Sequence, residues 1–428
     1  MTAPEEFQAQ FGPDTLSYLR PAQSILLGRL PDFSARSPTY PLFLIPATYL
    51  QSWRFLWLMQ LSVSVLGLIA YISLIKKYMF PSDSSKALAM ALFTWGPAQV
   101  VAWTGFVLPE GLMSSFLLMW IWLDSRQRNI HSMASIQFWG ARLFDAAFLM
   151  LRPAFLMWPI AVYGYRLLAG IWRHEDPKLM ARNIAILSWA LVIVGSFCFL
   201  VSLITNHFEI SYIGRSSQLG LVLNHGNLSF DNVCRQNPCS AVTKEALGII
   251  STAGNQFELY HSHSTTLSAN RVVETLSKRH GGLSRDAILD QMLSDLSPLA
   301  REGRVRHSID QFGRNLTTVP SSPRLIPEYG EIYGLWSAAC GLWGRIIAIG
   351  IIGLVLRPKS VTQNPLMKTA LAIWIYSAVV SSGFAYVGHS RLMAPVYTMF
   401  SLLGLSGLLV LGDSVRSLIL RCFRHQVV

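Results

Sequence analysis

The chain has 428 residues, of which 52% are hydrophobic and only 14% are charged, whereas ordinary soluble domains are about 25% charged. This composition, with a mean hydropathy of +0.38, excludes a disordered protein and argues against one large soluble domain. The net charge of +12 does not indicate nucleic-acid binding, because the basic residues stand at the ends of apolar runs and not along one polar face.

The apolar residues form runs of roughly 18–24, the length that crosses about 30 Å of hydrocarbon. We therefore predict an α-helical polytopic membrane protein with about nine transmembrane helices. The predicted spans cover residues 53–75, 87–104, 106–123, 134–151, 154–171, 184–205, 335–356, 366–386 and 392–412.

The spans divide the chain into five regions. We predict a first extracytoplasmic loop at 1–50, transmembrane helices 1–6 within 51–205, a mixed extracytoplasmic domain at 206–333, helices 7–9 within 334–412, and a basic cytoplasmic tail at 413–428.

Basic residues fix the predicted orientation of these spans. They occupy every second short connection, at Lys76, Lys77, Lys86, Arg126, Arg128, Arg173, Lys178, Arg182, Arg357, Lys359, Lys368, Arg416, Arg421 and Arg424. Because cytoplasmic loops carry the excess of Lys and Arg, we expect the C-terminus in the cytoplasm and both long polar stretches outside. The expected location is a bacterial inner (plasma) membrane, with the functional site on its periplasmic or outer side.

The outside N-terminus has no hydrophobic run before it. We therefore expect that a first transmembrane helix is absent from this sequence. The alternative is that the helix at 53–75 inserts with its short N-terminal flank translocated.

The outer domain is predicted to contain two amphipathic helices, at 268–280 and 284–300. In the second, apolar residues recur at helical spacing after Ser284, a candidate N-cap: Ile288, Leu289, Met292, Leu296 and Leu299. The segment 210–230 favours short strands and turns. Cys234 and Cys239 do not have zinc-ligand spacing, and outside the cytoplasm they favour a small-loop disulfide.

Two carboxylates are candidates for chemistry. Asp14 follows Gly12-Pro13, a turn that can open a helix, so it suits a helix cap, a general base, or both. Glu110 stands among apolar residues near the outer end of a span, either as an interfacial side chain or facing a cavity.

Three arginines, Arg152, Arg345 and Arg391, lie in or beside predicted spans. An arginine fork suits phosphate or pyrophosphate groups. The alternative for each is a snorkelling side chain or an intramembrane partner for Asp145.

Five short motifs then follow one another in a recognisable order. They are Asp14 with Tyr18, Arg36-Ser-Pro-Thr-Tyr40-Pro41, Leu108-Pro-Glu110, Leu151-Arg152-Pro153, and His389-Ser-Arg391-Leu-Met-Ala-Pro395. This series resembles the GT-C integral-membrane glycosyltransferases, in the branch of protein mannosyltransferases and lipid A aminoarabinose transferases. The resemblance covers residues 11–171 and about 335–412, but not the 206–333 domain.

The resemblance implies a sugar donor linked to a polyprenyl phosphate and an inverting hexosyl or pentosyl transfer outside the cytoplasm. It makes Asp14 the base, places Glu110 near the acceptor or donor sugar, and places Arg391 near the donor phosphate. Further substrate-binding residues are then expected at Tyr18, Arg36, Tyr40, Arg152, Arg345 and His389. The chain departs from the family in having Leu392 after Arg391 and in lacking a transmembrane helix before Asp14.

The residue chemistry agrees with this implication. Displacing a lipid phosphate from an anomeric carbon needs a base for the incoming hydroxyl and positive charge for the leaving phosphate. No Gly-rich phosphate loop occurs in the sequence, and a lipid-linked donor requires none. We expect a lipid, glycan or protein acceptor, contact with membrane lipids, and no nucleic acid. No cofactor is indicated with certainty, and a divalent cation shared by Asp14 and Glu110 is left open.

Two other functions compete with the transferase. A transporter or flippase of a lipid-linked glycan would use ionisable residues near the bilayer midplane, for which Asp145 and Arg345 are the candidates. A non-catalytic membrane scaffold would display the 206–333 domain.

Overall fold

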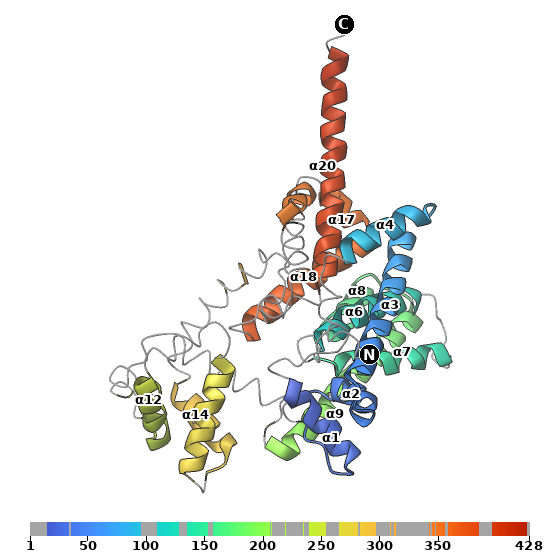
Figure 1. Cartoon of the computed structure of the whole chain (residues 1–428). Coiled ribbons are helices and arrows are strands. Elements are labelled where there is room, and N and C mark those ends of the chain that lie inside the picture. The colour runs from blue at the N-terminus through green and yellow to red at the C-terminus, as the bar shows by residue number, and fades with distance from the viewer. Residues whose placement is uncertain are drawn as a thin grey trace, which may run out of the picture.

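The structure, a computed structural model of the whole chain, is an assembly of helices (Figure 1). It describes residues 15–33, 36–95, 109–127, 135–152, 157–205, 207, 219, 234, 239–253, 265–280, 283–296, 309, 312–313, 342, 345–346, 348–355, 358–384 and 396–425. All elements within these residues are helical, as the apolar periodicity predicts.

The helices follow the chain as α1 (Thr15–Leu26), α2 (Thr39–Tyr49), α3 (Trp53–Tyr78), α4 (Ser84–Trp95), α6 (Glu110–Gln127), α7 (Ile136–Leu149), α8 (Met157–Trp172), α9 (Pro177–Thr205), α12 (Ala241–Ala253), α14 (Thr265–Arg279), α17 (Pro358–Gln363), α18 (Pro365–Phe384) and α20 (Tyr397–His425). Helical residues are also described at 285–296 and 348–355.

Three helices are long and apolar enough to cross a membrane: Trp53–Tyr78, Pro177–Ile204 and Tyr397–Ser417. They coincide with the predicted spans 53–75, 184–205 and 392–412. Within the described residues, no helix at the other predicted spans is both long enough and apolar enough to cross a membrane. α7 has 14 residues, which extend about 21 Å, and the 18-residue α6 includes Glu110, Asp124 and Arg126. The count of nine spans therefore stays a prediction.

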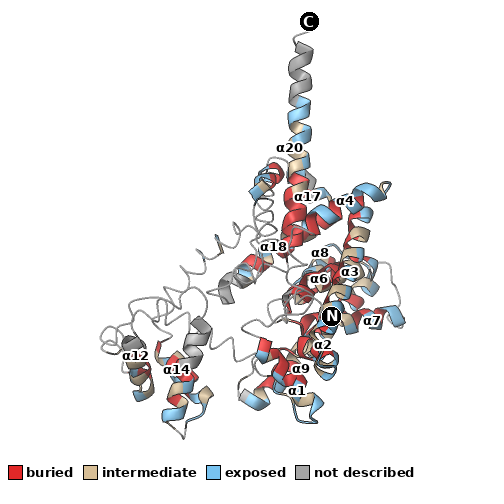
Figure 2. Ribbon diagram, viewed as in Figure 1, coloured by how far each residue is buried: buried red, intermediate tan, exposed pale blue. Residues whose placement is uncertain are grey.

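Many large apolar side chains on the long helices are exposed, as expected for helices that face lipid. On α9 they include Leu191, Val192, Phe199, Leu200 and Leu203. On α20 the first turns are buried, and the helix then continues as an exposed extension (Figure 2).

α3 and α6 run parallel and in close contact. A methyl group added to Gly67 would lie 2.7 Å from Cβ and 2.8 Å from Cα of Ser115, so only a glycine allows this approach. Farther along, Lys77 Nζ donates to the carbonyl oxygen of Ser125 at 3.1 Å. Small residues at such crossings let helix backbones pack directly in a membrane. The two contacts fix the register of α3 against α6.

Glycines also bring α20 against the helix at 348–355. Gly350 and Gly353 face Gly404 and Gly407 so closely that no side-chain carbon fits between the two backbones. This contact draws the last long helix into the bundle, with a backbone approach of the kind typical of membrane helices.

Hydrogen bonds join helix ends that the charge pattern assigned to one side of the membrane. At the predicted cytoplasmic side, Asn364 Nδ2 donates to the carbonyl oxygen of Tyr78 at 2.9 Å, beside the Lys77 contact. At the predicted outer side, the hydroxyls of Ser114 and Thr398 lie 3.4 Å apart. The side of the membrane on which each set of ends lies stays a prediction.

Within the predicted outer domain, the helices described are α12, α14 and the helix at 285–296. Ser284 Oγ accepts from the backbone N–H of Ala287 at 3.2 Å, which confirms the predicted N-cap. The predicted apolar face is buried at Ile288, Leu289 and Met292, while Leu299 lies outside the described residues. The strands predicted for 210–230 also lie outside them, except for Leu219, which is buried.

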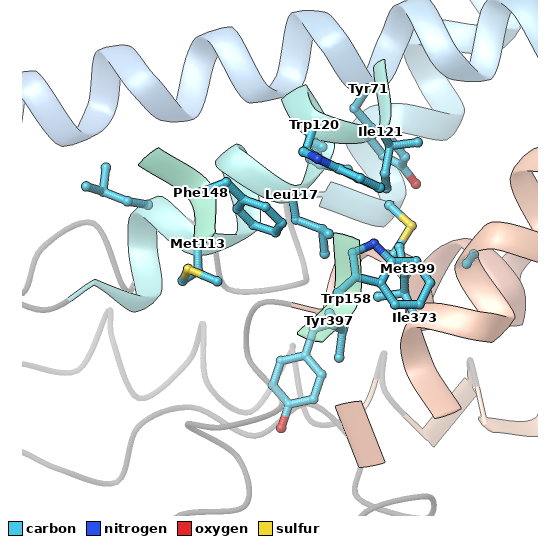
Figure 3. Packing of buried hydrophobic residues seen from close by; sticks show 14 of the residues in the cluster. Tyr71, Met113, Leu117, Trp120, Ile121, Phe148, Trp158, Ile373, Tyr397 and Met399 are labelled. Carbon is cyan, nitrogen blue, oxygen red and sulfur yellow. The ribbon is translucent and has the colours of Figure 1, made fainter. Parts of the chain in front are cut away.

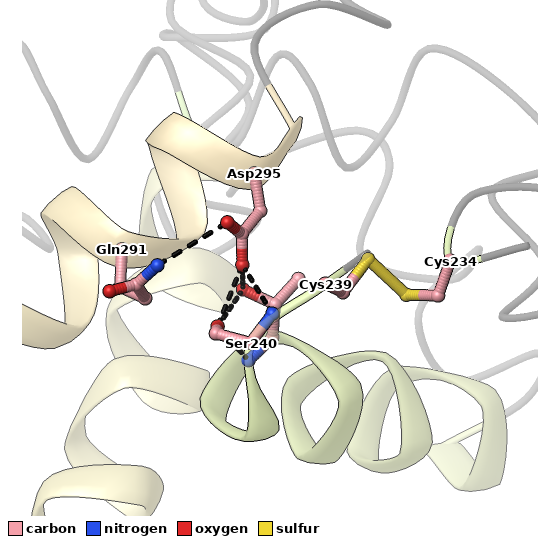
Figure 4. Close-up of a disulfide and its surroundings, with 6 residues drawn as sticks. Cys234, Cys239, Ser240, Gln291 and Asp295 are labelled. Carbon is pink, nitrogen blue, oxygen red and sulfur yellow. Dashed lines mark hydrogen bonds between the residues drawn. A yellow bond between two sulfur atoms is a disulfide. The ribbon is translucent and has the colours of Figure 1, made fainter. Parts of the chain in front are cut away.

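A disulfide joins Cys234 to Cys239, with 5.2 Å between their Cα atoms (Figure 4). The adjacent residue begins a hydrogen-bonded clamp: Asp295 Oδ2 accepts from Ser240 N at 2.9 Å, from Ser240 Oγ at 2.7 Å and from Thr243 Oγ1 at 2.7 Å. Burial would raise the pKa of Asp295, but these hydrogen bonds outweigh it and lower the pKa. The clamp fixes the start of α12 on the helix at 285–296.

The close approach at Gly67 predicts a strong effect of one methyl group. Gly67→Ala forces α3 away from α6 and should destabilise the protein by about 1–3 kcal/mol, the usual cost of overpacking. Gly195→Ala on α9 is the matched control, because a methyl group there meets nothing within 4 Å. Thermal unfolding in detergent measures both variants. Equal effects at the two glycines would contradict the packing argument.

The disulfide predicts a specific pattern of thiol labelling. In the denatured, unreduced protein, Cys234 and Cys239 should be unreactive, and a reductant should expose both. Cys198, a buried free cysteine, is the internal control and should label after denaturation with or without reductant. Labelling of Cys234 and Cys239 without reductant would show that the bond does not form.

Candidate functional site

A cluster of two tyrosines and one arginine forms where α1 meets α2. The rings of Tyr18 and Tyr40 pack edge to face, with centroids 5.2 Å apart. The guanidinium of Arg36 lies 4.7 Å from the Tyr18 ring centroid, and its Nε donates to Ser17 Oγ at 2.8 Å. Three residues that the sequence proposed as substrate-binding are therefore neighbours, and the stacked guanidinium is held in a defined orientation.

Local turn chemistry brings these residues together. α1 ends at Leu26. Gly28 follows it with a φ of +66°, the left-handed conformation that glycine adopts without strain. The backbone N–H of Arg29 then bonds back to the carbonyl oxygen of Ser24 at 2.8 Å, and the chain reverses. Pro38 stands just before α2. The reversal returns Arg36 to the first turn of α1.

Asp14, the proposed base, lies outside the described residues. It directly precedes Thr15, the first residue of α1, and Ser17 follows three positions later. Because Arg36 is bonded to Ser17 and stacked on Tyr18, its cationic group lies on the helical turn that follows Asp14 in the sequence.

The cluster is attached to two other helices. The hydroxyl of Tyr40 donates to Gln60 Oε1 on α3 at 3.2 Å, in a buried position. The backbone N–H of Thr39 donates to the carbonyl oxygen of Met150, at the end of α7, at 3.2 Å. Arg152 follows two residues later and is half-buried. The first and second motifs thus meet, and the second motif contacts Met150, the residue directly before the fourth motif.

The register of α3 places the start of α6 near this cluster. Gln60 precedes Gly67 by seven residues, or about 10 Å of helix, and Glu110 precedes Ser115 by five, or about 8 Å. Since Gly67 and Ser115 are in contact and the helices run parallel, the backbone of Glu110 lies at nearly the level of Gln60. The side chain of Glu110 is not among those described.

The start of α20 lies at the same end of the bundle. Ser114, one turn after Glu110, contacts Thr398 on the first turn of α20. His389 and Arg391 precede this turn in the sequence and lie outside the described residues. Arg345 is exposed, and no described contact joins it to the cluster.

A second set of charged residues is buried among α6, α7 and α8. Arg142 and Asp145 form an ion pair at 3.0 Å, with side chains 1% and 5% exposed, and Trp120 Nε1 donates to Asp145 Oδ1 at 2.8 Å. Arg166 binds Asp124 through both guanidinium nitrogens at 2.6 Å each. Within the described residues, these contacts give each buried carboxylate a cationic partner.

This pairing corrects one prediction. The sequence proposed Arg152, Arg345 or Arg391 as intramembrane partners for Asp145, but its partner is Arg142 on the same helix. Arg142 and Asp145 are three residues apart, a spacing that places two side chains on one helix face. This spacing is the feature of the sequence that indicates the pair. The contact between Asp124 and Arg166 joins different helices and had no such local signal.

The described residues do not contain three His, Cys, Asp or Glu side chains grouped for a metal ion. What the site offers in these residues is an oriented guanidinium, two aromatic rings and the N-terminal ends of α6 and α20. Such groups suit a ligand with an anionic head and a sugar or other ring.

The sequence matches no protein-family model and no curated protein. Among solved structures, the chain is similar to ArnT from Cupriavidus metallidurans in the apo state, at 12% identity and a TM-score of 0.32, over 93% of this chain and 73% of that chain. It is also similar to the same protein bound to undecaprenyl phosphate, at 12% identity and a TM-score of 0.31, over 94% and 74%. At these TM-scores the likeness carries no argument.

The buried pair of Arg142 and Asp145 predicts a non-additive loss of stability. Asp145→Asn leaves a buried guanidinium without its counter-ion and should cost about 3–5 kcal/mol, whereas the double variant Arg142→Leu/Asp145→Leu should cost much less. Glu274→Gln is the control, because it breaks an exposed pair with Arg285 at 3.5 Å and should cost below about 1 kcal/mol. Unfolding in detergent measures all three. A double variant no more stable than Asp145→Asn would contradict the pairing argument.

Proposed function

We propose that this chain is an integral-membrane glycosyltransferase that moves a hexosyl or pentosyl group from a polyprenyl-phosphate donor to an acceptor, with inversion, outside the cytoplasm. The observation that carries the proposal is that Tyr18, Arg36 and Tyr40, from two separate motifs, lie together at the start of α1, the helix that begins one residue after Asp14.

The proposed reaction needs a base and a cation. The acceptor hydroxyl attacks the anomeric carbon while Asp14 takes its proton, and the bond from that carbon to the phosphate oxygen breaks. The polyprenyl phosphate leaves with the electron pair of that bond, and positive charge stabilises it. Asp14 is proposed as the base and Arg391 as the cation, and a second guanidinium, that of Arg36, is bonded to Ser17, three residues after Asp14.

The remaining roles follow the motif order. Glu110 would bind the acceptor or donor sugar, and Arg391 would bind the donor phosphate. Tyr18, Arg36, Tyr40, Arg152, Arg345 and His389 would complete the substrate site. Support for Glu110 comes from the helix register, which brings the start of α6 level with Gln60. Support for Arg391 comes from the contact between Ser114 and Thr398, because Thr398 follows it by seven residues.

The proposed cellular setting follows from the charge pattern. A bacterial plasma membrane with the site on its outer side fits a donor carried by a polyprenyl lipid and an acceptor in the cell envelope. The acceptor class, whether lipid, glycan or protein, is left open, as is a divalent cation between Asp14 and Glu110.

The test is sugar transfer from a polyprenyl-phosphate donor by the purified chain. Asp14→Asn keeps the shape of the side chain and removes proton acceptance, so turnover should fall by about 10²–10⁴-fold while donor affinity stays nearly unchanged. Arg391→Ala should lower both turnover and donor affinity. Arg391→Lys should restore only part, because an ammonium group cannot reproduce the arginine fork.

Asp32→Asn and Arg29→Ala are matched controls, since both residues are exposed in the same outer segment and should keep full activity. If Asp14→Asn remained fully active, Asp14 would be a helix cap and the transferase proposal would lose its base. If Asp14→Asn abolished donor binding and Arg391→Ala left it unchanged, the two roles would be reversed.

A transporter or flippase of a lipid-linked glycan is the second candidate. The buried charges at Asp124, Arg142, Asp145 and Arg166 are the observation that favours it, since ionisable residues inside membranes often mark transport pathways. Such a protein would move the donor lipid across a vesicle membrane without transferring its sugar, and Asp14→Asn would not alter that movement.

A further inference from the structure

The hydroxyl of Tyr397 is a buried hydrogen-bonding group with no partner in the part of the chain that the structure describes. Tyr397 is the first residue of α20 and is 1% exposed. In Figure 3 its hydroxyl stands at the end of a ring that points away from the other labelled core side chains. One turn later, Ser401 is also buried, and its hydroxyl likewise has no described partner. The two residues lie on one face of the helix.

The other fully buried tyrosines provide a direct comparison. Tyr40 donates to Gln60, Tyr71 lies 2.8 Å from Thr94 Oγ1, and Tyr163 donates to Asp124 at 3.3 Å. Each of these hydroxyls reaches a polar group on another helix. A buried hydroxyl without a partner is unfavourable, and a phenylalanine would fill the same volume without that penalty. The Tyr397 hydroxyl therefore calls for a partner from outside the described chain.

The position of Tyr397 favours an anionic partner. It stands on the N-terminal turn of α20, a 29-residue helix, where backbone N–H groups lack intrahelical acceptors and the helix dipole is positive. Such ends bind phosphate in soluble proteins and anionic substrate groups inside membranes. Thr398, the next residue, contacts Ser114 near the start of α6, so a second helix N-terminus lies close to the same place.

We propose that the Tyr397 hydroxyl donates a hydrogen bond to the phosphate of the lipid-linked donor at the N-terminal turn of α20. This inference rests on the proposed function, because a polyprenyl-phosphate donor supplies the phosphate. The Tyr397 hydroxyl and the first backbone N–H groups of α20 would together give the phosphate directional hydrogen bonds, in the positive field of the helix end.

The test compares binding of undecaprenyl phosphate and of undecaprenol, which lacks the phosphate, to the purified full-length chain. Tyr397→Phe should lower the affinity for undecaprenyl phosphate by about 10- to 100-fold, as expected for the loss of a hydrogen bond to a charged group. It should leave undecaprenol binding unchanged. Without ligand, Tyr397→Phe should keep or raise the Tm, because it removes a polar group that has no partner.

Tyr71→Phe is the matched control. It also removes a single buried hydroxyl (Figure 3), but one that is already bonded within the chain. It should lower the Tm and leave the affinity for undecaprenyl phosphate unchanged. Inorganic phosphate provides a further arm: if it competes equally with undecaprenyl phosphate, the site binds free phosphate and the lipid-donor assignment is wrong.

Two failures are distinguishable. If Tyr397→Phe lowers the Tm and leaves the affinity for undecaprenyl phosphate intact, the hydroxyl has a structural partner such as an ordered water, and this inference is wrong. Transfer that still depends on Asp14 in the same protein would leave the proposed function standing. If the unmodified chain binds no undecaprenyl phosphate, the inference and the proposed function fail together.

Discussion

The contact between Gly67 and Ser115 is the constraint on which the rest of the site depends. Helices in a membrane cannot be sorted by the hydrophobic effect alone, since lipid is as apolar as leucine, so close backbone packing decides which helices meet. The absence of a side chain at Gly67 lets α3 lie directly on α6. Their parallel register brings Gln60, and through it Tyr40, level with the start of α6.

Buried ion pairs then add α7 and α8 to this pair of helices. A charge inside an apolar bundle is tolerated when a counter-ion lies against it. Asp124 on α6 therefore determines where Arg166 and α8 lie, while Trp120 binds the Arg142–Asp145 pair of α7. Because a helix is rigid over a few turns, placing Asp145 also places Met150, whose carbonyl oxygen accepts from Thr39. The charged core thus helps to position the aromatic cluster through α7 and Met150.

The sequence alone predicts features that depend on one segment. The spans at 53–75 and 184–205 correspond to long helices because their apolar runs have few internal charges. The Ser284 cap follows from a hydroxyl placed directly before an apolar periodic run. The resemblance assigned Tyr18, Arg36 and Tyr40 to one substrate site; they are neighbours in the structure, and their role stays a proposal.

Features that depend on pairing between segments were not predictable. The count of nine spans is not supported at α6 and α7, which are short or contain charged residues. The partners that stabilise these charges cannot be identified from a single sequence. The partner of Asp145 is different, because Arg142 lies three residues earlier on the same helix and its spacing is visible in the sequence, although the prediction placed the partner on other segments. The glycine contact of α3 with α6 leaves no trace in composition or periodicity, since Gly67 is one of several glycines in apolar runs.

The polar groups of the bundle fall into two classes with different consequences. Charges between α6, α7 and α8 are matched by opposite charges, so they stabilise one arrangement of helices and have little left to offer a ligand. At the end where α6 and α20 begin, the structure describes several donors: the guanidinium of Arg36, the Tyr397 hydroxyl and the first N–H groups of two helices. Donors held in place stabilise negative charge without reorganising when it develops. Such donors, together with the carboxylates proposed at Asp14 and Glu110, suit the proposed enzyme with a phosphate leaving group better than they suit a scaffold, which would gain nothing from the buried hydroxyl of Tyr397.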